Sequence, residues 1–166
     1  MDHEDLVALI RGGVEGPGGR WADLGAGEGN FTRALADLLG PEAHIVAVDR
    51  DRTALRALDG RFETRVADFT RPLDLRDLDG VLMANSLHFV RDKQPVLQAV
   101  REMIRPGGRL IIVEYDADRG NPWVPHPFSY ATWETMAARA GLKDTRLLST
   151  YPSRWLGRMY SAVSLS

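Results

Sequence analysis

The stretch Trp21-Ala22-Asp23-Leu24-Gly25-Ala26-Gly27-Glu28-Gly29-Asn30-Phe31 decides the fold. A short apolar run ends in three alternating glycines, and apolar residues at helical spacing resume at Phe31. This order predicts a strand, a tight turn and a helix start. Glycine permits positive φ and close approach of the backbone to a ligand, and the first turn of a helix presents free N–H groups with a partial positive charge. The stretch therefore predicts a polar ligand lying against the turn.

The spacing of the glycines separates two cofactor classes. A dinucleotide site has the pattern G-x-G-x-x-G, and here Asn30 stands at the place of the third glycine, while Gly29 comes one residue early. An NAD-type oxidoreductase is therefore the less favoured interpretation. The pattern Asp23-x-Gly25-x-Gly27-x-Gly29 instead resembles the first motif of class I S-adenosylmethionine (SAM)-dependent methyltransferases. The resemblance implies that the turn cradles the methionine part of SAM and that Asp23 helps to hold its amino group.

Length and composition limit the number of domains and the kinds of site that the protein can have. A chain of 166 residues fits one domain. It contains no cysteine, which excludes disulfides and a thiol nucleophile, and its four histidines show no metal-ligand spacing, so we expect no metal site. The acidic start and the lack of a long apolar run favour a cytoplasmic protein without a membrane span. The net charge of −2 and pI near 6.1 indicate no general attraction to nucleic acid.

Two further predicted strands end in carboxylates. The apolar run His44–Asp49 ends at Asp49, about 20 residues after the glycine turn, where doubly wound folds bind a ribose. The run 62–67 is followed by Asp68 and Phe69. In the methyltransferase family an acidic residue at this place binds the adenine amino group, and its apolar neighbour packs on the ring.

The second half of the predicted core carries two more family features. The stretch Ala84-Asn85-Ser86-Leu87-His88-Phe89 resembles the fourth motif of small-molecule members related to the quinone-biosynthesis methyltransferases. Asp92 is expected to cap a helix with Pro95 in its first turn. That helix closes with Arg105-Pro106-Gly107-Gly108, and a strand is expected to begin at Arg109.

The resemblance implies an α/β, Rossmann-like fold with a mostly parallel seven-stranded sheet in the order 3-2-1-4-5-7-6, strand seven antiparallel, and helices on both faces. We expect a single domain: an N-terminal helix and lead-in (1–19), a cofactor-binding core (20–115), and an acceptor-side loop, helix and closing hairpin (116–166). In that last part, Ser129 is expected to cap a helix over 130–140, with strands at 145–151 and 158–165. The implied cofactor is SAM, with S-adenosylhomocysteine (SAH) as product, and its expected contacts are Asp23, Gly25, Ala26, Gly27, Gly29, Asp49, Arg50, Asp68, Phe69, Asn85 and Ser86.

The implied reaction is transfer of a methyl group from SAM to an oxygen, nitrogen or carbon atom of a small molecule. Alignment and exclusion of water supply much of the rate in such a displacement. His88 is the best candidate for an assisting base, because neutral imidazole is available at pH 7, although a histidine in such a loop is more often an orienting residue. Tyr115 follows it, next to Glu114 and Asp116 at the end of the fifth strand.

A segment rich in aromatic residues predicts where the methyl acceptor binds. Trp123, His126, Phe128, Tyr130 and Trp133 occur within a loop and the helix that follows it. Trp123 and Phe128, with His88 and Tyr115, are the expected acceptor contacts, although the same aromatic residues could simply cover the sheet or form a subunit contact. A homodimer is one expectation. A non-catalytic SAM-binding or partner-binding module, and a methyltransferase acting on protein or RNA, are the alternatives.

Overall fold

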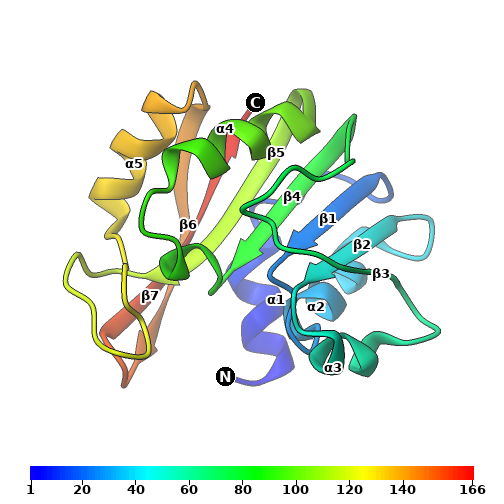
Figure 1. Ribbon diagram of the computed structural model, residues 1–166, viewed down its shortest axis with the longest axis horizontal. Helices are drawn as coiled ribbons and strands as arrows, with labels where there is room; N and C mark the ends of the chain where they lie inside the picture. The colour runs from blue at the N-terminus through cyan, green and yellow to red at the C-terminus, as the bar shows by residue number, and fades with distance from the viewer.

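The computed structural model describes all 166 residues and contains one sheet in the order β3-β2-β1-β4-β5-β7-β6 (Figure 1). Strands β1 to β5 run parallel, and β7 is antiparallel to both β5 and β6. The predicted order and the antiparallel seventh strand are confirmed. The strands are β1 (Arg20–Leu24), β2 (His44–Asp49), β3 (Glu63–Val66), β4 (Leu78–Ala84), β5 (Ile104–Tyr115), β6 (Lys143–Ser153) and β7 (Gly157–Leu165).

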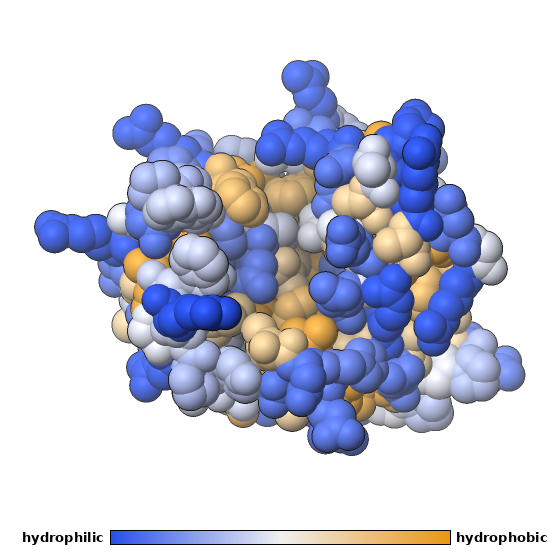
Figure 2. All heavy atoms as spheres, turned by 90° about the horizontal axis from the view of Figure 1, so that it is seen from below, coloured by the Kyte–Doolittle hydropathy of each residue, from blue (hydrophilic) through white to orange (hydrophobic).

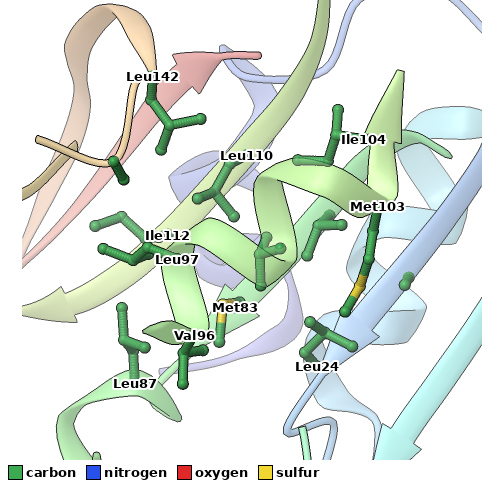
Figure 3. Packing of buried hydrophobic residues seen from close by; sticks show 14 of the residues in the cluster. Leu24, Met83, Leu87, Val96, Leu97, Met103, Ile104, Leu110, Ile112 and Leu142 are labelled. Atoms are coloured by element: carbon green, nitrogen blue, oxygen red, sulfur yellow. The ribbon is translucent and has the colours of Figure 1, made fainter. Parts of the chain in front are cut away.

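Helices cover both faces of the sheet. They are α1 (His3–Arg11), α2 (Asn30–Leu39), α3 (Arg52–Leu55), α4 (Gln94–Met103) and α5 (Tyr130–Arg139), with 3₁₀ turns η1 (Arg56–Leu58) and η2 (Leu87–Phe89). Successive side chains of a strand point to opposite faces. In β5, Leu110 and Ile112 therefore join the core under α4 and α5, whereas Ile111 and Val113 join the core under α1 and α2. Figure 3 shows α4 packed on the first of these faces.

The start of α4 differs from the sequence prediction. Pro95 lies in the first turn as expected, but the cap position belongs to Lys93, one residue after the predicted Asp92, and no side chain caps the helix. The Lys93 ammonium donates instead to the Val90 carbonyl, at 2.7 Å. The predicted cap of α5 by Ser129 is confirmed. At the start of α1, the Asp2 side chain accepts from the N–H of the third residue of the helix.

Strand β5 begins earlier than predicted. Its first residue is Ile104, which pairs with Leu78, whereas Arg109 pairs with Gly80. The Arg-Pro-Gly-Gly stretch is therefore a bulge within the strand, because these four residues of β5 lie opposite the single residue Asp79 of β4. Beyond the bulge, β4 and β5 stay in register as far as Ala84 and Val113. Their carboxyl ends consequently lie beside the carboxyl end of β1.

Candidate functional site

A cavity of about 420 Å³ lies at the carboxyl ends of the first four strands. Figure 2 views the molecule from this end and shows a hollow near the middle of the face. The cavity lies where ligands bind in doubly wound sheets, outside the strand ends at the point where the strand order reverses. Its lining residues are Gly25, Asp49, Arg50, Ala67, Asp68, Phe69, Thr70, Asn85, Ser86, Phe89 and Val90.

The glycine turn forms one wall of the cavity. The N–H groups of Gly25 and Ala26 both donate to the Val48 carbonyl, which ties the turn to the end of β2. Gly25 has φ of 83°, and a Cβ atom there would lie only 2.3 Å from the Ser86 Cβ. Gly25 is thus required both by its backbone conformation and by the close approach of the β4 end.

Gly27 is different, because it faces open space. Its φ is 56°, and a Cβ atom there would meet nothing within 4 Å. Its N–H donates to Asp49 Oδ2 at 2.8 Å, and the Asp51 N–H donates to Asp49 Oδ1 at the same distance. Each carboxylate oxygen keeps a lone pair, and Asp49 is only half-buried. Two hydroxyl groups of a ligand could therefore bind Asp49 side by side.

Asp68 and Phe69 supply the next wall. The hydroxyl and the N–H of Thr70 both donate to Asp68 Oδ1, at 2.7 and 2.9 Å. Both bonds lower the pKa of Asp68, and the bond from the hydroxyl has the larger effect. Oδ2 makes no hydrogen bond and has only the Arg71 guanidinium 3.9 Å away, so it is open to a donor from a ligand. The half-buried Phe69 ring packs against the core beside it.

Asp23 lies behind the glycine turn, and only 1% of its surface is exposed. Thr32 donates to Oδ2 at 2.7 Å, but Oδ1 has no hydrogen-bond partner. Burial raises the pKa of Asp23 to about 7, opposed by the Thr32 hydrogen bond and assisted by the charge of Asp49. A buried acceptor without a donor is costly, so Asp23 is poised to accept a hydrogen bond from a positively charged group.

Asn85 has a second buried acceptor atom without a hydrogen-bond partner. It follows the last residue of β4 in the left-handed conformation, with φ of 53°, and its N–H donates to the Val113 carbonyl at 2.8 Å. Its side-chain Oδ1 is buried without a partner, although the residue lines the cavity. Residues with a strained backbone conformation are more frequent at functional sites than elsewhere, and Asn85 combines such a conformation with an unpaired side-chain oxygen.

His88 lies in η2, next to the cavity but not on its wall. The ring is buried, with Nδ1 2.7 Å from Glu114 Oε2 and its centroid 4.3 Å from that of Phe89 and 5.7 Å from that of Tyr115. Nε2 makes no hydrogen bond and is not one of the wholly buried unpartnered atoms. Burial, together with the charge of Glu114, raises the pKa of the nearby Tyr115 hydroxyl.

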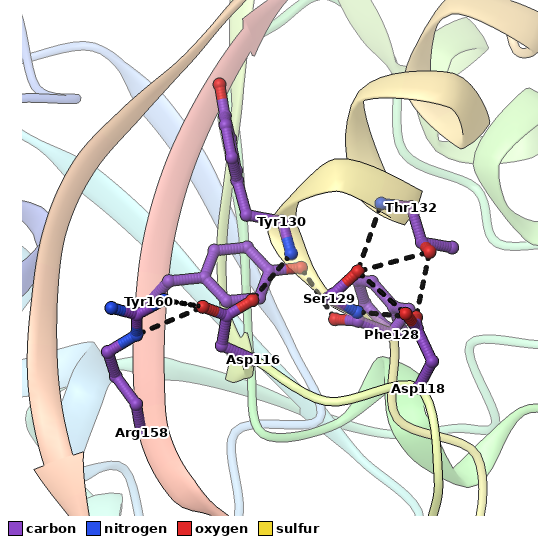
Figure 4. A network of polar contacts seen from close by, with 8 residues as sticks. All are labelled: Asp116, Asp118, Phe128, Ser129, Tyr130, Thr132, Arg158 and Tyr160. Carbon is purple, nitrogen blue, oxygen red and sulfur yellow. Dashed lines mark hydrogen bonds and ion pairs between the residues drawn. The ribbon is translucent and has the colours of Figure 1, made fainter.

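Two aspartates tie the start of the loop 116–129 to its end and to β7 (Figure 4). Asp116 accepts from the Arg158 guanidinium and from the Tyr130 N–H, while Asp118 accepts from Ser129 and Thr132. The loop presents Trp123, which is 67% exposed and lies 6.0 Å, between ring centroids, from the exposed Trp155 of the β6–β7 turn.

Phe128 is placed differently from the sequence expectation. Only 2% of it is exposed, and its ring packs on Trp133 and Tyr160 in the core. Its carbonyl also accepts from the Tyr160 hydroxyl at 3.1 Å. The ring therefore covers the sheet and is not available to an acceptor.

The structure brings most of the sequence-predicted cofactor residues together. Gly25, Asp49, Arg50, Asp68, Phe69, Asn85 and Ser86 line one cavity, whereas Asp23, Ala26, Gly27, Gly29, His88, Tyr115 and Trp123 lie outside its lining.

Sequence reasoning did not identify four of the lining residues, Ala67, Thr70, Phe89 and Val90. Ala67, Thr70 and Phe89 are immediate neighbours of predicted residues and Val90 lies two residues after His88, which is the signal that could have found them. Trp155 was also not identified, and its position 32 residues beyond Trp123 gives no local signal.

The structure contains no group of three or more histidine, aspartate or glutamate side chains arranged to hold a metal ion. No helix combines the length and the apolar character needed to cross a membrane. A larger hollow, of about 520 Å³, lies at the other end of β2, but it contains none of the predicted site residues.

Comparison with known proteins identifies the family of the chain. Residues 22–110 match the family model described as "Methyltransferase domain". The ubiquinone/menaquinone biosynthesis C-methyltransferase UbiE of Ectopseudomonas mendocina is 31% identical over 116 residues, which cover 64% of this chain and 45% of that protein. The UbiE of Teredinibacter turnerae is 30% identical and is matched over 44% of its length. The matched stretch thus spans less than half the length of these curated relatives.

Solved structures share the whole fold. A SAM-dependent methyltransferase of Thermotoga maritima has a TM-score of 0.79 at 16% identity, covering 98% of this chain and 88% of that one. The YcgJ protein of Bacillus subtilis has a TM-score of 0.80 at 12% identity, covering 99% of both chains. With the family match over 22–110, the glycine turn and the shared strand order, the chain belongs to the class I SAM-dependent methyltransferase family.

Proposed function

We propose that this protein binds SAM in the cavity at the strand ends and transfers its methyl group to an oxygen, nitrogen or carbon atom of a small molecule. The observation that carries the proposal is the convergence of residues from four separate strand ends on one cavity. Gly25 follows β1, Asp49 ends β2, Asp68 follows β3 and Asn85 follows β4. Each stands where the family places a different part of the cofactor.

The unsatisfied groups of the site fit SAM part by part. Asp23 Oδ1 and Asn85 Oδ1 are acceptors without donors, which suits the ammonium of the methionine part. The open space at Gly27 leaves room for the chain of that part. Asp49 has a free lone pair on each oxygen for the two ribose hydroxyls, and the free Oδ2 of Asp68 suits the adenine amino group.

When bound, SAM supplies a methyl group on a positively charged sulfur atom that is already a good leaving group. The protein has to hold the acceptor in line with that methyl group and exclude water. In this proposal His88 Nε2 takes the proton from the attacking O–H or N–H group, because it is unpartnered and next to the cavity wall formed by Phe89 and Val90.

The acceptor is proposed to be a flat or apolar small molecule. Trp123 and Trp155 form an exposed aromatic pair, and the loop that carries Trp123 is fixed by Asp116 and Asp118. Aromatic surface of this kind favours aromatic or apolar partners. The relatives named as C-methyltransferases support a carbon atom among the three atom types.

The test is isothermal titration calorimetry with SAH and, separately, NAD. The wild type is expected to bind SAH and not NAD. Asp68→Asn removes the acceptor at Oδ2 while an amide oxygen keeps both bonds from Thr70, so the SAH dissociation constant should rise about tenfold, the equivalent of one hydrogen bond. Asp59→Asn, at an exposed position, is the matched control.

A second measurement separates binding from catalysis. SAM turnover is followed as SAH release with a panel of catechols, hydroquinones and aromatic amines. No SAH binding by the wild type contradicts the proposal outright. Binding without turnover of any acceptor would indicate a SAM-binding module of the same fold.

A further inference from the structure

Glu114 is a wholly buried carboxylate near the carboxyl end of β5, with none of its surface exposed. Its Oε1 accepts from the N–H groups of Leu87 and His88, at 3.0 and 3.2 Å, and its Oε2 lies 2.7 Å from His88 Nδ1. A buried carboxyl group with three such partners is fully satisfied. All three partners belong to η2, so Glu114 fastens this turn to the sheet.

The bonding pattern decides which ring nitrogen of His88 carries the proton. The backbone N–H groups can only donate, which makes Oε1 an acceptor twice over and favours the ionised carboxylate. The buried Lys93 ammonium adds a favourable charge interaction with Glu114. An ionised carboxylate cannot donate, so Nδ1 carries the hydrogen, and the neutral ring then has its lone pair on Nε2.

The fastened turn also forms part of the proposed cofactor site. Four residues at the two ends of this turn line the cavity: Asn85, Ser86, Phe89 and Val90. Between them, Leu87 and His88 bind Glu114 on the inner side. The His88 carbonyl accepts from the His126 N–H at 3.0 Å, which links the same turn to the loop 116–129. One carboxylate therefore holds together the cofactor wall and the acceptor-side loop.

We propose that Glu114 is the positioning residue of this site: it holds His88 as the Nδ1–H tautomer with Nε2 free to accept a proton from the methyl acceptor. The proposal rests on the proposed function for the role of Nε2. The tautomer itself is independent of that function. Glu114 acts through His88 and touches neither substrate nor cofactor.

Glu114→Gln makes a sharp prediction, because the amide has one acceptor and one donor end. If the amide oxygen keeps the two backbone N–H groups, the NH₂ group faces Nδ1 and must donate to it. The opposite orientation would set the NH₂ group against two backbone donors. The substitution is therefore expected to invert His88 to the Nε2–H tautomer without unfastening the turn.

The tautomer is measured in the free protein by long-range ¹H–¹⁵N NMR of the histidine rings, with His88→Gln used to assign the His88 signals. The expected result is a protonated Nδ1 in the wild type, a protonated Nε2 in Glu114→Gln, and a wild-type pattern in the exposed control Glu102→Gln. A wild-type ring protonated at Nε2, or no change in Glu114→Gln, overturns the proposal. The wild-type spectrum alone tests it if the variant does not fold.

Turnover supplies the functional readout once an acceptor is found. With the wrong tautomer, Glu114→Gln is expected to lower kcat by roughly 10²- to 10⁴-fold, the range over which a misplaced proton disables a histidine base, with a smaller effect on KM. Calorimetry with SAH keeps the two proposals apart. A wild type that shows the expected tautomer but binds no SAH would refute the proposed function and leave the role of Glu114 in place.

Discussion

Replacing Asp23 with asparagine tests the electrostatics of the buried acidic residue behind the glycine turn. Asp23 is 1% exposed, its Oδ2 accepts from Thr32, and its Oδ1 has no donor. Because burial raises its pKa to about 7, the folded protein buries an incompletely paired negative charge above that pH. Asparagine has nearly the same shape and keeps an oxygen for Thr32, but it carries no charge.

The magnitude follows from the difference between the folded and unfolded pKa values. The pKa of Asp23 has its ordinary value of 3.8 in the unfolded chain and is about 7 in the folded protein. Between these values the folded state holds a proton that the unfolded state has lost, so stability falls as the pH rises through this window. A difference of about three units corresponds to roughly 4 kcal/mol in all, of which about 2 to 3 kcal/mol is lost between pH 5 and pH 9.

The assay is urea denaturation of wild type and Asp23→Asn at pH 5, 7 and 9. The unpaired amide of the variant costs about 1 to 3 kcal/mol, but this cost is the same at every pH. The free energy of unfolding of the variant, minus that of the wild type, is therefore expected to rise by about 2 to 3 kcal/mol from pH 5 to pH 9. All other titrating groups cancel in this difference.

At high pH, where Asp23→Asn is expected to gain stability relative to the wild type, it should lose affinity for the cofactor. At pH 8 the variant lacks the carboxylate proposed to hold the SAH ammonium, so its affinity for SAH should fall by roughly 10- to 100-fold. Wild-type affinity should decline as the pH drops below about 7 and Asp23 becomes protonated. A stability difference that stays constant from pH 5 to pH 9 would refute the electrostatic reasoning, and unchanged SAH affinity would refute the contact.

Gly25→Ala is expected to destabilise the protein by at least about 2 kcal/mol and to abolish SAH binding, because its Cβ would overlap Ser86 in a left-handed backbone. Gly27→Ala, also left-handed but facing open space, should lower stability by only about 1 kcal/mol, and thermal denaturation of the two variants compares them. Equal losses would contradict the steric argument. Trp123→Ala should leave stability and SAH affinity nearly unchanged while lowering turnover, since the ring is exposed on the acceptor-side loop. Full turnover in that variant would remove Trp123 from the acceptor site.

The cofactor half of the site could be predicted from local patterns. The glycine spacing after β1 and the carboxylates at the ends of β2 and β3 are written in short stretches of sequence. Because parallel strands place their carboxyl ends at one edge of the sheet, naming the strands was enough to bring Gly25, Asp49 and Asp68 together. The predicted helix cap Ser129 is equally local, and it is confirmed.

Other features depended on which segments become neighbours. The α4 cap fell on Lys93 and not on Asp92, and the Lys93 ammonium donates back to the Val90 carbonyl. Strand β5 includes the Arg-Pro-Gly-Gly stretch as a bulge, because Ile104 before the stretch also pairs with β4. Phe128 belongs to a segment rich in aromatic residues, and only packing against Trp133 and Tyr160 directs its ring into the core.

The sequence by itself determined the family and, through that resemblance, the strand order. It also identified seven of the eleven residues that line the cavity at the strand ends, since these follow recognisable strand-turn patterns. Only the tertiary structure decided that Glu114 meets His88, 26 residues away in the chain, and that Trp123 meets Trp155. It also decided that Asp23 is buried with one unpaired oxygen. These contacts join separate strand ends and loops, so their chemistry depends on burial and on partners that no local pattern specifies.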